Sequence, residues 1–260
     1  MSKRYAIVGD IIAETRGDQI VPGGAAAIGL ALRELDGEVT LRSRIGTDDA
    51  GTDVLQQIKA ARIHPKNIDK VDGKTTQITR DPDGSASDLQ PGVLMTKGEV
   101  LDIYALFGHD TLVLDLLDQS LRHFLIDLPA HTDGTVRMLT TLGHLDRLPQ
   151  HTDKLDIAMR CDTIVGTQAQ FETLTGEARA SDALGLIFER MPLTHLRAAV
   201  AITPAGLEII ARDTRVLKPV RDAIPGLLVP QVVAGIAWGM ANRADWDTTA
   251  EVCLDPEAAE

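Results

Sequence analysis

Aromatic residues and cysteines are scarce in this chain. Phe, Trp and Tyr make up 3% of the 260 residues, although 44% of the residues are hydrophobic. The core must therefore be built from Ala, Val, Ile and Leu, which suits aliphatic strands covered by helices. The two cysteines, Cys161 and Cys253, have a spacing that fits neither a metal site nor a disulfide framework. We therefore expect a reducing compartment, the cytoplasm, and no bound metal.

Positive charge is also in short supply. Lys and Arg total 26 against 38 Asp and Glu, which gives a net charge of −12. An acidic surface repels phosphate backbones, so we expect no nucleic-acid partner. The first ten residues show no signal-peptide pattern. One uncharged stretch, 223–241, is long enough to cross a membrane, but its two prolines and three glycines favour a loop that leads into a buried helix. No membrane association is expected.

Apolar runs alternate with helical patterns along the chain. Strand-like segments and segments with helical periodicity follow one another from the amino terminus onward. Strands are expected at 5–8, 38–46, 74–80, 111–117, 135–143, 161–167, 197–206, 207–213 and 215–220, and helices at 25–35, 48–63, 118–128, 168–176 and 230–242. This alternation predicts an α/β fold with a mostly parallel sheet in a single domain over 1–260. Residues 70–108 are the expected excursion from that sheet, and the acidic tail 255–260 is expected to fray.

The amino-terminal motifs resemble those of the ribokinase family, also called the PfkB carbohydrate kinases. The family has a polar segment after its first strand, a Gly-Gly turn that opens a helix, and a G-x-D-x-x-G turn. In this sequence these correspond to Gly9-Asp10, Gly23-Gly24 and the segment from Gly46 through Asp48 to Gly51. Two later segments, CDTIVGTQAQFETLTGE and VVAGIAWGMANRAD, are similar to further parts of the family pattern. The resemblance implies a ribokinase-like three-layer sandwich with a small or reduced β lid.

The resemblance also implies an activity and a set of site residues. The activity is phosphoryl transfer from ATP, with Mg, to a hydroxyl of a sugar or nucleoside. The residues carried over for the sugar-like substrate are Asp10, Glu14, Gly23, Gly24 and Asp48, and those for the nucleotide are Thr167, Gln170, Thr203, Gly206 and Gly226. Several have structural alternatives: Asp48 suits a turn or a helix cap, Asp10 and Glu14 could cap nearby backbone, and Gly23-Gly24 could serve a tight turn alone.

The catalytic motif of the family is degraded here. Its G-A-G-D sequence, which supplies an anion hole and a general base, falls on Leu227, Leu228, Val229 and Pro230. Pro230 suits the first position of a helix but cannot take a proton. Asp222, the nearest acid, lies eight residues earlier and is the fallback base. Losing the base costs about 10²–10⁴-fold, and losing each anion-hole donor costs about 10²–10³-fold more.

Two hypotheses follow from these departures. The leading hypothesis is a kinase-like protein that has lost phosphoryl transfer and needs no cofactor, and that acts as a binding, regulatory or scaffolding subunit. A homodimer or a protein partner, joined through the lid, and a sugar-like ligand would fit this role. The alternative is an active sugar or nucleoside kinase whose base has moved to Asp222 or Glu14.

Overall fold

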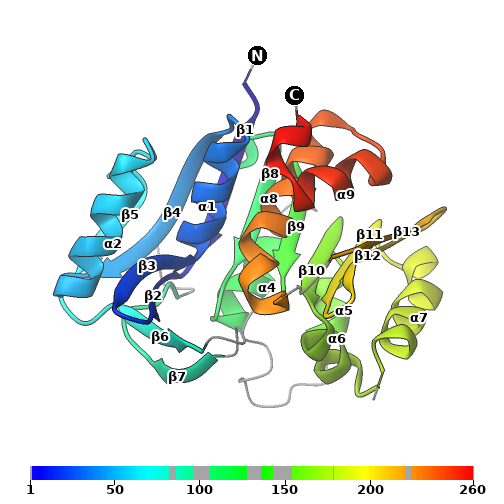
Figure 1. The fold of residues 1–260 in the computed structure, drawn as a ribbon, viewed down its shortest axis with the longest axis horizontal. Coiled ribbons are helices and arrows are strands. Elements are labelled where there is room, and N and C mark those ends of the chain that lie inside the picture. The colour runs from blue at the N-terminus through cyan, green and yellow to red at the C-terminus, as the bar shows by residue number, and fades with distance from the viewer. Residues whose placement is uncertain are drawn as a thin grey trace.

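A nine-stranded sheet forms the centre of the computed structural model, which describes residues 2–81, 86–96, 106–127, 136–142, 154–177, 179–220 and 224–259 (Figure 1). The strand order is β13-β12-β11-β10-β9-β8-β1-β4-β5, parallel from β5 to β11 and antiparallel for β12 and β13. The strands are β1 (Arg4–Gly9), β4 (Glu38–Gly46), β5 (Ile68–Val71), β8 (Thr111–Asp115), β9 (Arg137–Thr141), β10 (Thr163–Thr167), β11 (Ala198–Thr203), β12 (Gly206–Ala211) and β13 (Arg215–Pro219). The predicted α/β class with a mostly parallel central sheet is confirmed.

Helices cover both faces of the sheet, because successive side chains of each buried strand point to opposite sides. Ile7 of β1 packs into the cluster that holds the apolar residues of α1 and α8, whereas its neighbour Val8 packs with Leu121 and Leu125 of α4. Figure 1 shows α1 and α8 side by side over one face. The helices are α1 (Ala25–Glu34), α2 (Asp49–Ala60), α4 (Gln119–Asp127), α5 (Lys154–Ala158), α6 (Gln168–Thr175), α7 (Ala180–Arg190), α8 (Pro225–Asn242) and α9 (Trp246–Leu254).

A second sheet of four strands lies beside the first. Its order is β3-β2-β6-β7, formed by β2 (Ile11–Arg16), β3 (Gln19–Gly24), β6 (Thr76–Arg80) and β7 (Ala86–Gln90). β6 and β7 lie inside the expected excursion at 70–108, but β2 and β3 come from the segment directly after β1. The hairpin of β2 and β3 turns at Gly17-Asp18, a two-residue turn flanked by Arg16 and Gln19. The second sheet is thus built from two distant segments.

Several boundaries differ from the sequence expectations. α8 begins at Pro225, five residues before the expected start at Pro230, and α7 was not expected at all. Pro256–Ala259, in the acidic tail, forms a short 3-10 helix, η5. Two other 3-10 turns, η1 (Pro65–Asn67) and η4 (Met191–Leu193), each lie between a helix and the next strand of the main sheet. Among the described residues, no helix is both long and apolar enough to cross a membrane.

Candidate functional site

Asp10 lies directly after β1 and is 2% exposed. Its Oδ1 accepts a hydrogen bond from the backbone N–H of Met95 at 2.8 Å, and its Oδ2 accepts one from Leu117 at 2.7 Å. Burial raises the pKa of this carboxyl from 3.8 to about 6, although the two N–H donors lower it. Asp10 therefore ties the chain returning from the second sheet to the loop after β8. Each of its two oxygens accepts one of these hydrogen bonds, so Asp10 holds the two segments together.

Glu14 lies on β2 and is enclosed by two arginines. Arg16 contacts its Oε2 at 2.7 Å, and Arg80 of β6 contacts its Oε1 at 2.8 Å. Burial raises the pKa of Glu14, but the hydrogen bonds and charges of Arg80 and Arg16 outweigh it, and the net pKa lies below the ordinary value. The carboxylate also lies over Gly23, where any Cβ would be 2.5 Å from Glu14 Cγ. Gly23 is therefore needed to make room for Glu14.

Asp48 caps the amino end of α2, as one of the sequence alternatives predicts. Its Oδ1 accepts from the Gly51 N–H at 3.1 Å and from the N–H and hydroxyl of Thr75 at 3.1 and 2.6 Å. Gln77 of β6 reaches Oδ2 at 3.4 Å. Burial raises the pKa of Asp48, but these hydrogen bonds dominate and lower it. Because β6 also carries the arginine that holds Glu14, one strand of the second sheet connects both carboxylates.

A cavity opens next to Asp48, at the carboxyl ends of β4 and β5. Its empty volume is about 530 Å³, including its open mouth. Gly46, Thr47 and one face of α2 line it, together with the ammonium-bearing side chains of Lys59 and Lys70. In open α/β sheets, ligands bind outside the carboxyl ends of strands, so this is the expected side of the molecule.

The residues carried over for a nucleotide lie further along the same edge. Thr167 ends β10, which is separated from β4 by β9, β8 and β1. The Gln170 side chain accepts from the Thr167 N–H at 2.8 Å, and the Gln170 N–H donates to the Thr167 hydroxyl at 3.4 Å, which forms a capping box at the start of α6. Their hydrogen-bonding groups are therefore engaged with each other.

The turn between β11 and β12 is equally self-contained. The Thr203 hydroxyl donates to the Gly206 carbonyl at 3.0 Å and accepts from the Ala205 N–H at 3.2 Å. Gly206 has φ +139°, and a Cβ there would lie 2.2 Å from the Lys218 carbonyl oxygen. Only glycine fits this backbone, whatever else the position does.

The segment that was expected to form a degraded catalytic loop is part of helix α8. Pro225, not Pro230, occupies the first turn, and Gly226 through Val229 are helical. Leu228 and Val229 pack against the main core cluster. The residues after Gly226 continue the helix, and the backbone N–H groups of Leu227 and Leu228 both donate to the Ile224 carbonyl. Pro230 lies inside the helix, and it cannot donate to the Gly226 carbonyl one turn earlier. The first turn carries no acidic residue, and the fallback base, Asp222, lies outside the described residues.

Some residues around this edge were not foreseen from the sequence. Arg122 of α4 is fully enclosed and donates to the carbonyls of Leu116 and Thr141, the latter at 2.5 Å, and to the Thr140 hydroxyl at 3.1 Å. Burial lowers its pKa. Nothing in the local sequence distinguishes a buried arginine from a surface one on a helix. In the described part of the chain, no group of three His, Cys, Asp or Glu side chains is arranged to hold a metal ion.

Comparison with known proteins identifies the fold. No family model matches the sequence, and no curated protein matches it either. Solved structures do match. The fructokinase of Vibrio cholerae O395, bound to fructose, ADP and calcium, has a TM-score of 0.74 at 16% identity, over 99% of this chain and 90% of that chain. Ribokinase of Arabidopsis thaliana with ribose and ATP has a TM-score of 0.71 at 16% identity, over 100% and 91%. A nucleoside kinase of Burkholderia thailandensis with inosine has a TM-score of 0.71 at 18% identity, over 98% and 89%.

The chain therefore has the ribokinase-like fold. Its structural neighbours are sugar and nucleoside kinases of the ribokinase type, and the expected three-layer architecture matches theirs. At 16–18% identity the likeness concerns the fold. The residues that carry chemistry must be judged one by one.

Proposed function

We propose that this chain is a ribokinase-fold protein without phosphoryl-transfer activity, which binds a sugar-like or nucleoside-like molecule and acts as a binding, regulatory or scaffolding subunit. The observation that carries the proposal is the first turn of α8. A kinase of this fold needs a carboxylate and open backbone N–H groups there, by the family pattern. The first two turns of α8 offer Pro225, Gly226, three aliphatic side chains and Pro230. None of these side chains can remove a proton or hold developing charge.

Three carboxylates at this edge, those of Asp10, Glu14 and Asp48, are already held by other groups. A general base must come within about 3 Å of the acceptor hydroxyl, and a carboxylate that is already held by other donors is a weaker base. Both oxygens of Glu14 are held by arginines, and both oxygens of Asp10 accept backbone N–H groups. Asp48 accepts four hydrogen bonds from Gly51, Thr75 and Gln77. A relocated base in Glu14 would first have to leave two ion pairs.

Ligand binding suits the same edge. The cavity beside Asp48 is lined by hydroxyl, amide and ammonium groups, which can hydrogen-bond the hydroxyls of a sugar. A cytoplasmic location and a homodimer joined through the second sheet belong to the same proposal, and sedimentation of the purified chain tests the dimer.

The deciding experiment separates ligand binding from chemistry. The thermal midpoint is followed with Mg-ATP and with a panel of sugars and nucleosides, and ADP formation is assayed in the same mixtures. We expect a member of the sugar or nucleoside panel to stabilise the chain and Mg-ATP at millimolar concentration to leave the midpoint unchanged, because only ligands of the folded state raise it. ADP formation that depends on a sugar or nucleoside would overturn the proposal. The Glu14→Gln variant is the control for an active kinase, since any such activity that relies on Glu14 must vanish with it.

A further inference from the structure

A second cavity lies at the opposite edge of the main sheet, where the parallel strands begin. Arg137 opens β9, Asp162 directly precedes β10, and Arg197 directly precedes β11, so three adjacent strands each place a charged side chain there. Met240 near the end of α8 and Trp246 at the start of α9 complete the wall. The empty volume is about 330 Å³, including the mouth. The ligand edge discussed above contributes no residue to it.

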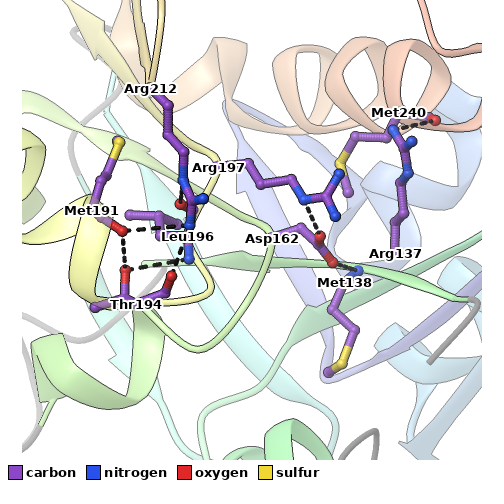
Figure 2. A network of polar contacts seen from close by, with 9 residues as sticks. All are labelled: Arg137, Met138, Asp162, Met191, Thr194, Leu196, Arg197, Arg212 and Met240. Atoms are coloured by element: carbon purple, nitrogen blue, oxygen red, sulfur yellow. Dashed lines mark hydrogen bonds and ion pairs between the residues drawn. The ribbon is translucent and has the colours of Figure 1, made fainter. Parts of the chain in front are cut away.

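Arg137 is the half-buried cation of this cavity. One of its N–H groups donates to the Met240 carbonyl at 3.1 Å. A guanidinium has five N–H donors, so most of them are left for another acceptor. Among the described residues, no carboxylate oxygen lies within 4.0 Å of the Arg137 nitrogens. Asp162 is the acid in the cavity wall, and its oxygens contact Arg197 and Met138 instead. Figure 2 shows the Arg137 guanidinium beside the end of α8.

Asp162 is neutralised by a different pair of donors. Its Oδ1 contacts Arg197 Nε at 3.0 Å, and its Oδ2 accepts from the Met138 N–H at 2.9 Å. Figure 2 shows this carboxylate pointing at Arg197 and Met138. Within the described part of the chain, the charge of Arg137 is therefore left without a compensating carboxylate. This is unusual in a chain whose net charge is −12, where acidic partners are abundant.

We propose that this cavity binds a small oxyanion, the phosphate or carboxylate group of a small molecule. Arg137 would hold the group with paired N–H donors, a geometry that guanidinium and oxyanions share. Arg197, whose side chain is 61% exposed, can turn from Asp162 to the ligand, and Trp246 lines the cavity where the rest of the molecule would lie. The contact with Met240 positions the Arg137 guanidinium at the cavity. This site does not depend on the proposed function at the other edge.

The two tryptophans of the chain, Trp238 and Trp246, allow a direct test. Only Trp246 lines the cavity, so its indole N–H signal in a ¹H–¹⁵N spectrum reports on the site, with Trp238→Phe assigning the two signals. The probes are inorganic phosphate and acetate, titrated separately at constant ionic strength. We expect at least one of them to shift the Trp246 signal saturably while the Trp238 signal stays in place. Saturation by phosphate alone identifies a phosphate ligand, and saturation by acetate a carboxylate.

Matched arginine variants complete the test. Arg137→Gln is expected to weaken the titration at least tenfold. Arg212→Gln is the control, because Arg212 also donates to backbone carbonyls, those of Leu196, Met191 and Thr194, but does not line the cavity (Figure 2). Arg137→Lys keeps the charge at the end of α8 and serves if the Gln variant does not fold; it too should bind several-fold less tightly. No saturable shift with either anion, or equal binding by the wild type and the Arg137 variants, overturns the proposal.

Discussion

Replacing Asp10 with Asn tests whether burial of the Asp10 carboxylate after β1 lowers the free energy of unfolding. The two backbone donors, Met95 and Leu117, favour a charged acceptor, yet burial dominates and raises the pKa to about 6. Asn keeps the shape of the side chain and removes the ionisation. It offers one acceptor for two N–H groups, so we expect it to lower the free energy of unfolding by about 1–3 kcal/mol at acidic pH.

The pH dependence of the free energy of unfolding gives a more specific expectation than its value at one pH. A carboxyl whose pKa is higher in the folded chain contributes stability that is fully present below the ordinary value of 3.8 and lost as the pH rises through about 6. The loss totals about 3 kcal/mol, because each pKa unit corresponds to about 1.36 kcal/mol. About 2 kcal/mol of this falls between about pH 4.5 and 7.5. Only the wild type loses it, so the deficit of Asp10→Asn should shrink by that amount across this range.

Urea unfolding of both proteins over a pH series measures the deficit. Asp245→Asn is a control of opposite sign, because the backbone N–H and hydroxyl of Thr248 lower the pKa of Asp245. Its contribution is present above the ordinary pKa and lost as the pH falls, so the deficit of that variant should grow with pH. An Asp10→Asn deficit that stays constant or grows as the pH rises would refute the reasoning, since the carboxylate would then be stabilised by its N–H donors more than it is penalised by burial.

Two further pairs of substitutions have expected outcomes that unfolding measurements check. Gly206→Ala forces a Cβ against a carbonyl oxygen and should cost more than about 1 kcal/mol, whereas Gly176→Ala, with a positive φ but open space, should cost less; equal losses would contradict the contact argument. Arg80→Gln removes the more buried of the two arginines that pair with the Glu14 carboxylate, and it should lower the free energy of unfolding by about 3 kcal/mol at pH 7. Arg16→Gln removes a partner that is 41% exposed and should cost below about 1 kcal/mol, so a larger loss than for Arg80 would reverse the assignment.

The sequence predicted the regular elements with strong periodicity. Glu38–Gly46 alternates as a strand, and Ala25–Glu34 has helical spacing closed by Gly37, so both elements form where expected. The hairpin of β2 and β3 was missed because its residues read as a polar strand end, although Gly17-Asp18 between alternating residues is a hairpin signal. The start of α8 was misplaced because either of two prolines can open a helix, and only packing of Leu228 against the core selects Pro225.

The candidate site was less predictable than the fold. The positions of Asp10, Glu14 and Asp48 near one edge follow from the strand order. Arg16 and Gly51 are local partners of Glu14 and Asp48, but the other partners come from β6, from the loop after β8 and from other distant segments, which periodicity cannot pair. Glu14 and Arg80 are 66 positions apart in the sequence, and no local pattern predicts their contact.

β13 bears on how the protein behaves at high concentration. As the last strand on its side of the main sheet, it presents an open row of backbone groups on which a strand from another molecule could add. Arg215 and Lys218 place charge along this strand, and Pro219 has no N–H to offer. Lys218 is further drawn toward α9 by Asp247 and Glu251 at 3.4 and 3.1 Å. These residues disfavour the pairing of a strand from another molecule with β13, even though Leu217 is exposed between the charged side chains.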